Sequence, residues 1–378
     1  MSDETGNSGR GRSRAGTPLL TTGTESTPLT SVWINAKEHA SVPVSGELAG
    51  KVTGHGAFGW RPSAVAPTPP PLEEPTDGTP PPAVVLLDGH LKPAELVDGY
   101  WDQQLLPDGP VDRTALDGPD QDAVVEAVQA ATLVYGSHYG HATFIAGLVR
   151  QVAPRARLLS IPVASDDGHT DEEDILAALV RVAASGGLVD VAGTTCKVAV
   201  VLVASGRRVT ASQARAELAD RTTILERLRA AVVALGPDVT VVTSAGNWGS
   251  DERAYPAWFA QDLPNVVAVG ALDPDGHRPA FSSWGEWVGA WERGTDVVSC
   301  MPFTVSLPRP TAGTDEATGA TAQETTNAAW SGTSFAAALH AGRLAQGVGG
   351  VEYPVAQDVP PAAVPPLPPL EPAGAAGP

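Results

Sequence analysis

The chain has 378 residues and a formal net charge of −19, from 24 Lys and Arg against 43 Asp and Glu. So acidic a protein repels nucleic acid and anionic membranes, which excludes both as expected partners. No apolar run approaches the roughly 20 residues that a membrane-spanning helix needs. No apolar stretch typical of a signal peptide follows the basic residues at the N-terminus, so we expect an intracellular, cytoplasmic protein.

Composition divides the chain into four expected parts. Residues 1–60 are a polar N-terminal segment whose short apolar pieces suggest a small appendage, and residues 61–82 are a proline-rich linker. Residues 83–349 contain the patterns of a folded domain. Residues 350–378 are a proline-rich tail that we expect to be disordered. This tail is either a solvated end or the ligand of a proline-binding partner.

The folded part contains apolar runs rich in β-branched residues, at 83–87, 157–164, 198–204, 239–244 and 265–271. Near-continuous apolar runs of this length are typical of parallel strands buried on both faces. Helical patterns occur at 141–152, 172–185, 212–235 and 334–346. Thr170 and Glu173 precede and open the second helix with the spacing of a capping box. The alternation predicts an α/β fold with a doubly wound, mainly parallel sheet and helices on both faces.

Polar residues at the ends of these elements are the candidates for function. Asp88 directly follows the first apolar run, and Asn247 follows the fourth in "SAGNWG". His141 begins the helix "HATFIAGLVRQV", and Ser334 begins the last helix in "WSGTSFAAALHAG". Nucleophilic catalysis needs a hydroxyl group, an imidazole, a carboxylate that orients the imidazole, and a donor for the oxyanion. These residues supply one of each.

Each candidate also has a structural interpretation. Ser334 is a suitable N-cap for its helix, and Asp88 and Asn247 are common turn residues. His138, three positions before His141, is a rival base. The other histidines show no metal-ligand spacing, so we expect no metal centre. Cys196 and Cys300 are too few for a disulfide framework, although one bridge or two reduced thiols are both compatible with the sequence.

The order Asp, His, Ser and several separated segments resemble the subtilisin-like serine proteases, the subtilase family. "SGTSFAAALHAG" resembles the nucleophile signature, "GHATFIAGLV" the histidine signature, and "TSAGNWG" the oxyanion segment. "QVAPRARLLSIPVA" and "YPAWFAQDLPNVVAVGALDPDGHRPAFSSWG" are also similar to the family. The resemblance covers about residues 83–349. It implies a subtilisin-like fold with Asp88, His141 and Ser334 as catalytic residues and Asn247 as oxyanion donor.

The sequence departs from the family pattern at several positions. Gly89 and His90 follow Asp88, where the family usually has Ser or Thr and then Gly. Ala338 replaces a usual proline, which should do no harm inside a helix. The segment that pairs with substrate backbone usually carries Ser-Leu-Gly, whereas "LVASGRR" offers only Ser205 and Gly206 as substrate-binding residues.

The resemblance implies a serine endopeptidase that hydrolyses protein or peptide substrates through an acyl-enzyme. No cofactor is required; family members often bind calcium, but no ligand set can be named here. The alternative is a catalytically impaired subtilase fold that acts as a binding or regulatory module, for which the altered motif after Asp88 is the only support. Asp166 and Asp167, in the acidic stretch "SDDGHTDEED", either favour Arg or Lys upstream of the cleaved bond or belong to a solvated loop.

Overall fold

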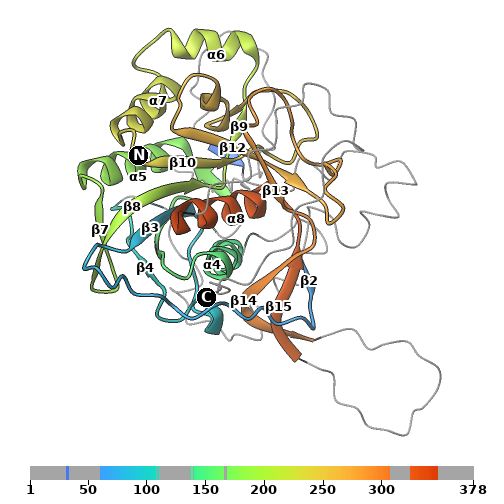
Figure 1. Cartoon of the computed structure of the whole chain (residues 1–378). Helices are drawn as coiled ribbons and strands as arrows, with labels where there is room; N and C mark the ends of the chain where they lie inside the picture. Colours follow the sequence, from blue (N-terminus) through green and yellow to red (C-terminus); the bar gives the residue numbers. More distant parts are fainter. Residues whose placement is uncertain are drawn as a thin grey trace, which may run out of the picture.

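A mainly parallel sheet forms the centre of the computed structural model, which describes residues 31–33, 60–107, 109, 138, 140–165, 168–306 and 324–347. The strand order is β13-β12-β10-β8-β3-β5-β4, with β7 paired to β8 (Figure 1). The strands are β3 (Pro82–Asp88), β4 (Trp101–Gln103), β5 (Arg157–Pro162), β7 (Leu188–Val191), β8 (Thr194–Val203), β10 (Thr240–Ser244), β12 (Val266–Leu272) and β13 (Ala290–Arg293). All adjacent pairs are parallel except β7 with β8. This topology confirms the predicted fold class.

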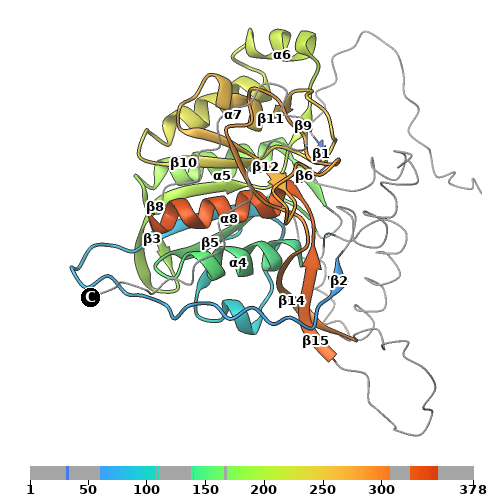
Figure 2. The ribbon, with the colours of Figure 1, turned by 45° about the vertical axis from the view of Figure 1, so that its right-hand side comes forward.

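Helices cover both faces of the sheet. Helices α4 (His141–Val152) and α8 (Thr333–Gln346) pack on one face, and α5 (Glu172–Ala184) and α7 (Ile224–Ala234) on the other (Figure 2). Side chains of β3 alternate between the two cores: Val84 and Leu86 join the α4–α8 side, while Val85 joins the α5–α7 side. Burial on both faces explains why this strand is apolar at every position up to Asp88.

Short strands form three smaller sheets around this centre. Strand β1 (Ser31–Trp33) pairs antiparallel with β6 (His169–Asp171), and β9 (Arg207–Arg208) pairs antiparallel with β11 (Ala254–Tyr255). Strands β14 (Val297–Ser306), β15 (Glu324–Trp330) and β2 (Arg61–Pro62) form the third sheet. Two 3-10 helices, η2 (Glu95–Val97) and η3 (Ala257–Gln261), and helix α6 (Ala211–Leu218) complete the described elements.

The proline-rich stretch before β3 packs against the domain at several points. Leu72 packs against the α4–α8 core, the Glu73 N–H donates to the carbonyl of Pro154 at 3.0 Å, and Glu74 forms an ion pair with Arg157. The predicted boundaries at residues 60, 82 and 349 stay predictions. The predicted tail, residues 350–378, lies outside the described residues.

Two local predictions are wrong. The predicted helix over 212–235 is divided into α6 and α7, because the Asp220 carboxylate accepts the Thr222 N–H at 2.9 Å and the Thr223 hydroxyl donates to the Asp220 carbonyl at 2.8 Å. These bonds form a turn that ends α6. The capping box at the start of α5 is also absent: the N-cap is Asp171, whose carboxylate accepts the Glu173 N–H at 3.0 Å.

Helix length and cysteine state can also be read from the described residues. The longest described helix, α8, has 14 residues, and none of these helices is long and apolar enough to cross a bilayer. Cys196 and Cys300 are both free and buried. Of the two alternatives for the cysteines, the structure therefore contains the pair of thiols.

Candidate active site

The candidate residues lie together at the carboxyl ends of three neighbouring strands, β10, β8 and β3. Asp88 is the last residue of β3, and Ala204 directly follows β8, its neighbour in the sheet. Asn247 lies three residues beyond the end of β10. After β3, the chain places β4 and β5 on one side of β3. It then places β8, β10, β12 and β13 on the other side, so the direction of winding changes between β3 and β8. Such a switch point is where open α/β sheets bind ligands.

Asp88 and His141 form a buried hydrogen-bonded pair. The Nδ1 atom of His141 lies 2.9 Å from Oδ1 and 3.0 Å from Oδ2 of Asp88, and the two side chains are 2% and 0% exposed. The Gly89 N–H donates to Asp88 Oδ1 at 2.7 Å. The loop after Asp88 is fixed to α4, because Lys92 and Thr143 exchange hydrogen bonds of 2.9 and 3.1 Å. The altered sequence after Asp88 therefore keeps the carboxylate in contact with the imidazole.

The Asp88 carboxyl group has a pKa below its ordinary value of 3.8. Its complete burial opposes ionisation and acts to raise the pKa. The charge and hydrogen bond of His141, the charge of His138 and the Gly89 N–H together outweigh that penalty. Asp88 is consequently an anion over the whole neutral range, as an orienting carboxylate must be.

Aromatic rings enclose His141. The ring of His138 stacks on it with centroids 4.0 Å apart, while Trp330 and Phe335 approach it at 5.4 and 5.2 Å. Phe335 belongs to the first turn of α8 and directly follows Ser334. The imidazole is therefore held between the His138 ring, which precedes α4, and the rings at the end of β15 and at the start of α8. Of the two histidines, it is His141 that is hydrogen-bonded to Asp88.

Ser334 does not cap its helix. The N-cap of α8 is Gly332, and Ser334 is the second helical residue. Its Oγ donates to the carbonyl of Ala204, at the end of β8, at 3.3 Å. The hydroxyl group is thus directed away from the helix backbone, beside the N–H groups of the first turn that have no partner within a helix. The N-cap interpretation of Ser334 is wrong.

Asn247 is oriented by the residue that precedes Ser334. Its Oδ1 accepts the Thr333 N–H at 2.9 Å and the Thr333 hydroxyl at 3.0 Å, while Thr333 Oγ1 accepts the Gly246 N–H at 3.1 Å. With Oδ1 used in this way, the Nδ2 group is the part of the amide that remains to donate to a ligand. Sequence reasoning missed Thr333, because its role depends on a contact 86 residues away.

The predicted substrate-binding residues have different positions. Ser205 follows Ala204, is 2% exposed, and its Oγ has no hydrogen-bond partner among the described residues. Gly206 lies against β11, since a Cβ atom added there would be 3.1 Å from the carbonyl oxygen of Tyr255. Asp166 and Asp167 lie outside the described residues.

Two groups of the described residues bring together potential metal ligands. One consists of Asp88, His138 and His141, and the other of Asp273, Asp275 and His277. Calcium prefers six to eight oxygen ligands, but the second group offers two carboxylates and an imidazole. Asp273 Oδ1 already accepts the N–H groups of Asp275 and His277 at 3.0 and 2.8 Å. Neither group has the oxygen-rich ligand set that calcium prefers.

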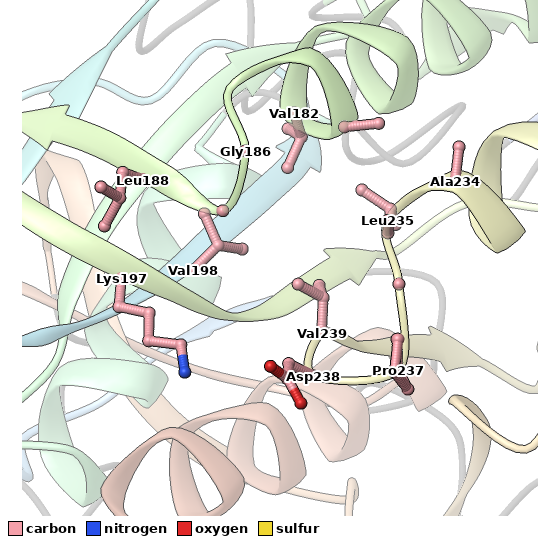
Figure 3. Close-up of a pocket in the computed structure, with 13 residues that line it drawn as sticks. Val182, Gly186, Leu188, Lys197, Val198, Ala234, Leu235, Pro237, Asp238 and Val239 are labelled. Carbon is pink, nitrogen blue, oxygen red and sulfur yellow. The ribbon is translucent and has the colours of Figure 1, made fainter.

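A separate cavity of about 330 Å³ lies near the amino end of β8, and Figure 3 shows the residues that line it. It is lined by the C-terminal ends of α5 and α7 and by the beginning of β8, including Val182, Leu235 and Lys197. Because Asp88, Asn247 and Ser334 are at the carboxyl ends of the strands, this cavity is not part of the candidate active site.

An Asp–His pair, a serine at a helix start and an oriented amide on a doubly wound sheet define the arrangement of a subtilisin-like serine hydrolase. The sequence profile of the subtilase family matches residues 124–352, more than half of the chain. The chain belongs to the subtilase family.

Known relatives match parts of the chain. It is 31% identical over 161 residues to the thermophilic serine proteinase of Bacillus sp. strain AK1, covering 43% of this chain and 32% of that protein. It is 28% identical over 184 residues to subtilisin-like protease 2 of Pseudogymnoascus destructans, covering 47% and 40%. The chain therefore spans less than half the length of these relatives. A solved lanthipeptide protease has 19% identity and a TM-score of 0.45, with 70% of this chain and 72% of that chain covered.

Proposed function

We propose that this chain is a serine endopeptidase that hydrolyses peptide bonds in proteins or peptides through an acyl-enzyme. The observation that carries the proposal is the buried hydrogen bond between Asp88 and His141, 2.9 Å long, beside the first turn of α8. Family membership supports the same reaction class. A purely binding module has no need for an ionised carboxylate buried against an imidazole, because such burial is costly unless it serves a site.

In the proposed mechanism, Ser334 Oγ attacks the carbonyl carbon of the substrate while His141 Nε2 accepts the hydroxyl proton. Asp88 holds Nδ1 in its protonated form and stabilises the imidazolium that results. To react, Ser334 exchanges its bond to the Ala204 carbonyl for one to His141; catalytic hydrogen bonds commonly tighten only in the substrate complex.

The Asn247 Nδ2 group and the Ser334 N–H would stabilise the negative oxygen of the tetrahedral intermediate. His141 then transfers its proton to the nitrogen of the leaving amine, and the C–N bond breaks. Water subsequently attacks the acyl-enzyme, again with His141 as base, and the acid product leaves. In acylation His141 passes the Ser334 proton to the amine, and in deacylation it passes a proton from water to Ser334 Oγ. The enzyme is thereby regenerated.

The substrate backbone is proposed to lie beside the segment 204–206, where Ser205 and Gly206 follow β8. Family resemblance supports this position, with the residues upstream of the cleaved bond along this segment and along the loop that contains β6. In this structure β6 pairs antiparallel with β1, in the register Val32 with Thr170. Strand β1 therefore occupies this edge of β6, and an extended substrate would pair with β6 by strand addition in the place of β1.

The test is labelling of the purified full chain with a fluorophosphonate probe, followed by mapping of the modified residue by mass spectrometry. We expect a single adduct on Ser334, which is absent from the Ser334→Ala variant, and hydrolysis of casein by the wild-type chain. The variant should hydrolyse casein several orders of magnitude more slowly, since only binding and oxyanion effects remain. Equal hydrolysis by the two proteins contradicts the proposal. A wild-type chain that binds peptides without labelling or hydrolysis supports the impaired binding module instead.

A further inference from the structure

Arg207 connects two segments that flank the candidate active site. Its Nε atom donates to Glu172 Oε1 at 2.9 Å, and its two terminal nitrogens donate to the two oxygens of Glu217 at 3.3 and 2.8 Å. Glu217 belongs to α6, whereas Glu172 is the first residue of α5 and directly follows β6. The guanidinium group thus holds three elements from different parts of the chain.

The two segments both reach the catalytic candidates. Arg207 immediately follows the segment 204–206, in which the Ala204 carbonyl accepts the Ser334 hydroxyl. On the other side, Gly168 precedes β6, and a Cβ atom added there would lie 3.3 Å from the ring of His138. The His138 ring stacks on His141. The two segments that Arg207 connects therefore lie beside the nucleophile and beside the base.

The pair between Arg207 and Glu172 is largely removed from water. The side chains of Glu172 and Arg207 are 2% and 12% exposed, and the second carboxylate oxygen of Glu172 has no hydrogen-bond partner among the described residues. Burial raises the pKa of Glu172, and the Arg207 guanidinium opposes that rise. Removing the arginine would leave a buried carboxylate without its counter-ion, so the position of β6 and α5 depends on this contact.

Backbone pairing fixes the other side of Arg207. Residues 207 and 208 form β9, in register with Tyr255 and Ala254 of β11, and the Val209 N–H donates to the Arg253 carbonyl at 3.0 Å. These hydrogen bonds hold the backbone of Arg207 in place. If the ion pair is lost and β6 moves, residue 207 would therefore not move with it.

We infer that Arg207 is a positioning residue, which holds β6 at a fixed distance from the segment 204–206 so that an extended substrate backbone that takes the place of β1 on β6 can bind both. This inference rests on the proposed function. The residue has no contact with the reacting atoms, so its effect falls on the binding of long substrates. A substrate that consists of a single residue needs only Ser334, His141 and the oxyanion donors, and should not depend on Arg207.

The experiment compares kcat and KM for two substrates: an extended peptide from a site that the wild-type chain cleaves in casein, and the single-residue ester of the residue at that cut. The variants are Arg207→Ala, Arg207→Lys and, as a matched control, Arg227→Ala. Arg227 forms an ion pair of 2.6 Å with Glu173, the neighbour of Glu172, but both side chains are nearly half exposed and Arg227 lies on α7.

For Arg207→Ala we expect kcat/KM on the peptide to fall at least about tenfold, mainly through KM, with hydrolysis of the ester within about threefold of wild type. Arg207→Lys should lie between Ala and wild type, because lysine keeps one ion pair but lacks the planar fork that contacts both carboxylates. Arg227→Ala should keep the wild-type ratio of peptide to ester.

An unchanged ratio in Arg207→Ala, or a parallel loss on both substrates, overturns the inference. If Arg207→Ala does not fold, as judged by near-UV circular dichroism, Arg207→Lys decides: a ratio equal to wild type overturns the inference, and a reduced ratio with normal ester hydrolysis supports it. A wild-type chain that hydrolyses neither substrate contradicts both the proposed function and this inference. If the wild-type chain is active but Arg207→Ala leaves the ratio of peptide to ester hydrolysis unchanged, only the inference is contradicted.

Discussion

The Asn247 side-chain oxygen accepts two hydrogen bonds from Thr333, one from its N–H at 2.9 Å and one from its hydroxyl at 3.0 Å. Thr333 Oγ1 in turn accepts the Gly246 N–H, so the hydroxyl proton is the one that is directed at Asn247. The amide is thereby fixed with its oxygen toward α8 and its NH2 group free for a ligand. An oxyanion donor that is oriented in advance needs no reorganisation during the reaction.

Thr333→Val should lower kcat while leaving KM nearly unchanged. Valine keeps the shape and the backbone N–H but removes the hydroxyl that orients Asn247 and accepts from Gly246. One such hydrogen bond is worth about 1 kcal/mol, which corresponds to a decrease of roughly fivefold in kcat. Steady-state kinetics on one peptide measures this effect. Thr333→Ser, which keeps the hydroxyl, is the matched control, and a serine variant as slow as the valine variant would contradict the role of the hydroxyl.

Asn247→Ala should reduce kcat by about 10²–10³-fold with little change in KM, because its NH2 group interacts with the developing oxyanion more strongly than with the bound substrate. The measurement is kcat and KM on the same peptide, with the melting temperature of the variant as control for folding. A change confined to KM would show that Asn247 binds substrate in the ground state instead.

Asp88→Asn should leave the fold intact and lower kcat by about 10⁴-fold, because an amide at this position favours the wrong tautomer of His141. The pair is buried and the Gly89 N–H already occupies one carboxylate oxygen, so the asparagine has little freedom to compensate. Kinetics at neutral pH and circular dichroism test this expectation. Activity within about tenfold of wild type would mean that another group orients the imidazole.

The parts of the site that the sequence predicts lie at the ends of regular, buried elements. The apolar run that ends at Asp88, the run before Asn247 and the helix that begins at His141 have clear periodicity, and the carboxyl edge of a parallel sheet brings such ends together. Their catalytic roles stay predictions until the variants are measured.

Contacts between distant polar residues are not encoded in any local pattern. Arg207 and Glu172 are separated by 35 positions, and neither stands out in its own segment. Local signals also compete with tertiary ones. Thr170 has the spacing of a capping residue, yet it pairs with Val32 in a strand, and Asp171 takes the N-cap position instead. Asp171 also pairs with Ser31 in this strand, so the helix begins directly after β6, one residue later than the spacing of Thr170 and Glu173 predicts.

A buried histidine away from the active site predicts how stability depends on pH. His340, in α8, is 5% exposed, and burial, assisted by the charge of Arg343, lowers its pKa from 6.5 to about 4. The folded chain therefore holds His340 neutral in a range where the unfolded chain protonates it. Because the unfolded state binds more protons between these two values, the free energy of unfolding decreases as the pH falls from about 6.5 towards about 4.

Between pH 7 and pH 5 the wild type should lose about 2 kcal/mol of unfolding free energy through His340. His340→Gln removes the titrating group, so its unfolding free energy should decrease less over this range, although glutamine lowers stability at every pH. The same change at His277, whose side chain is 41% exposed, is the matched control. Urea unfolding of the three proteins at pH 5, 6 and 7, followed by tryptophan fluorescence, measures the slopes. If His340→Gln and wild type lose equal stability between pH 7 and pH 5, then His340 is accessible to protons in the folded chain and its burial does not control the acid sensitivity.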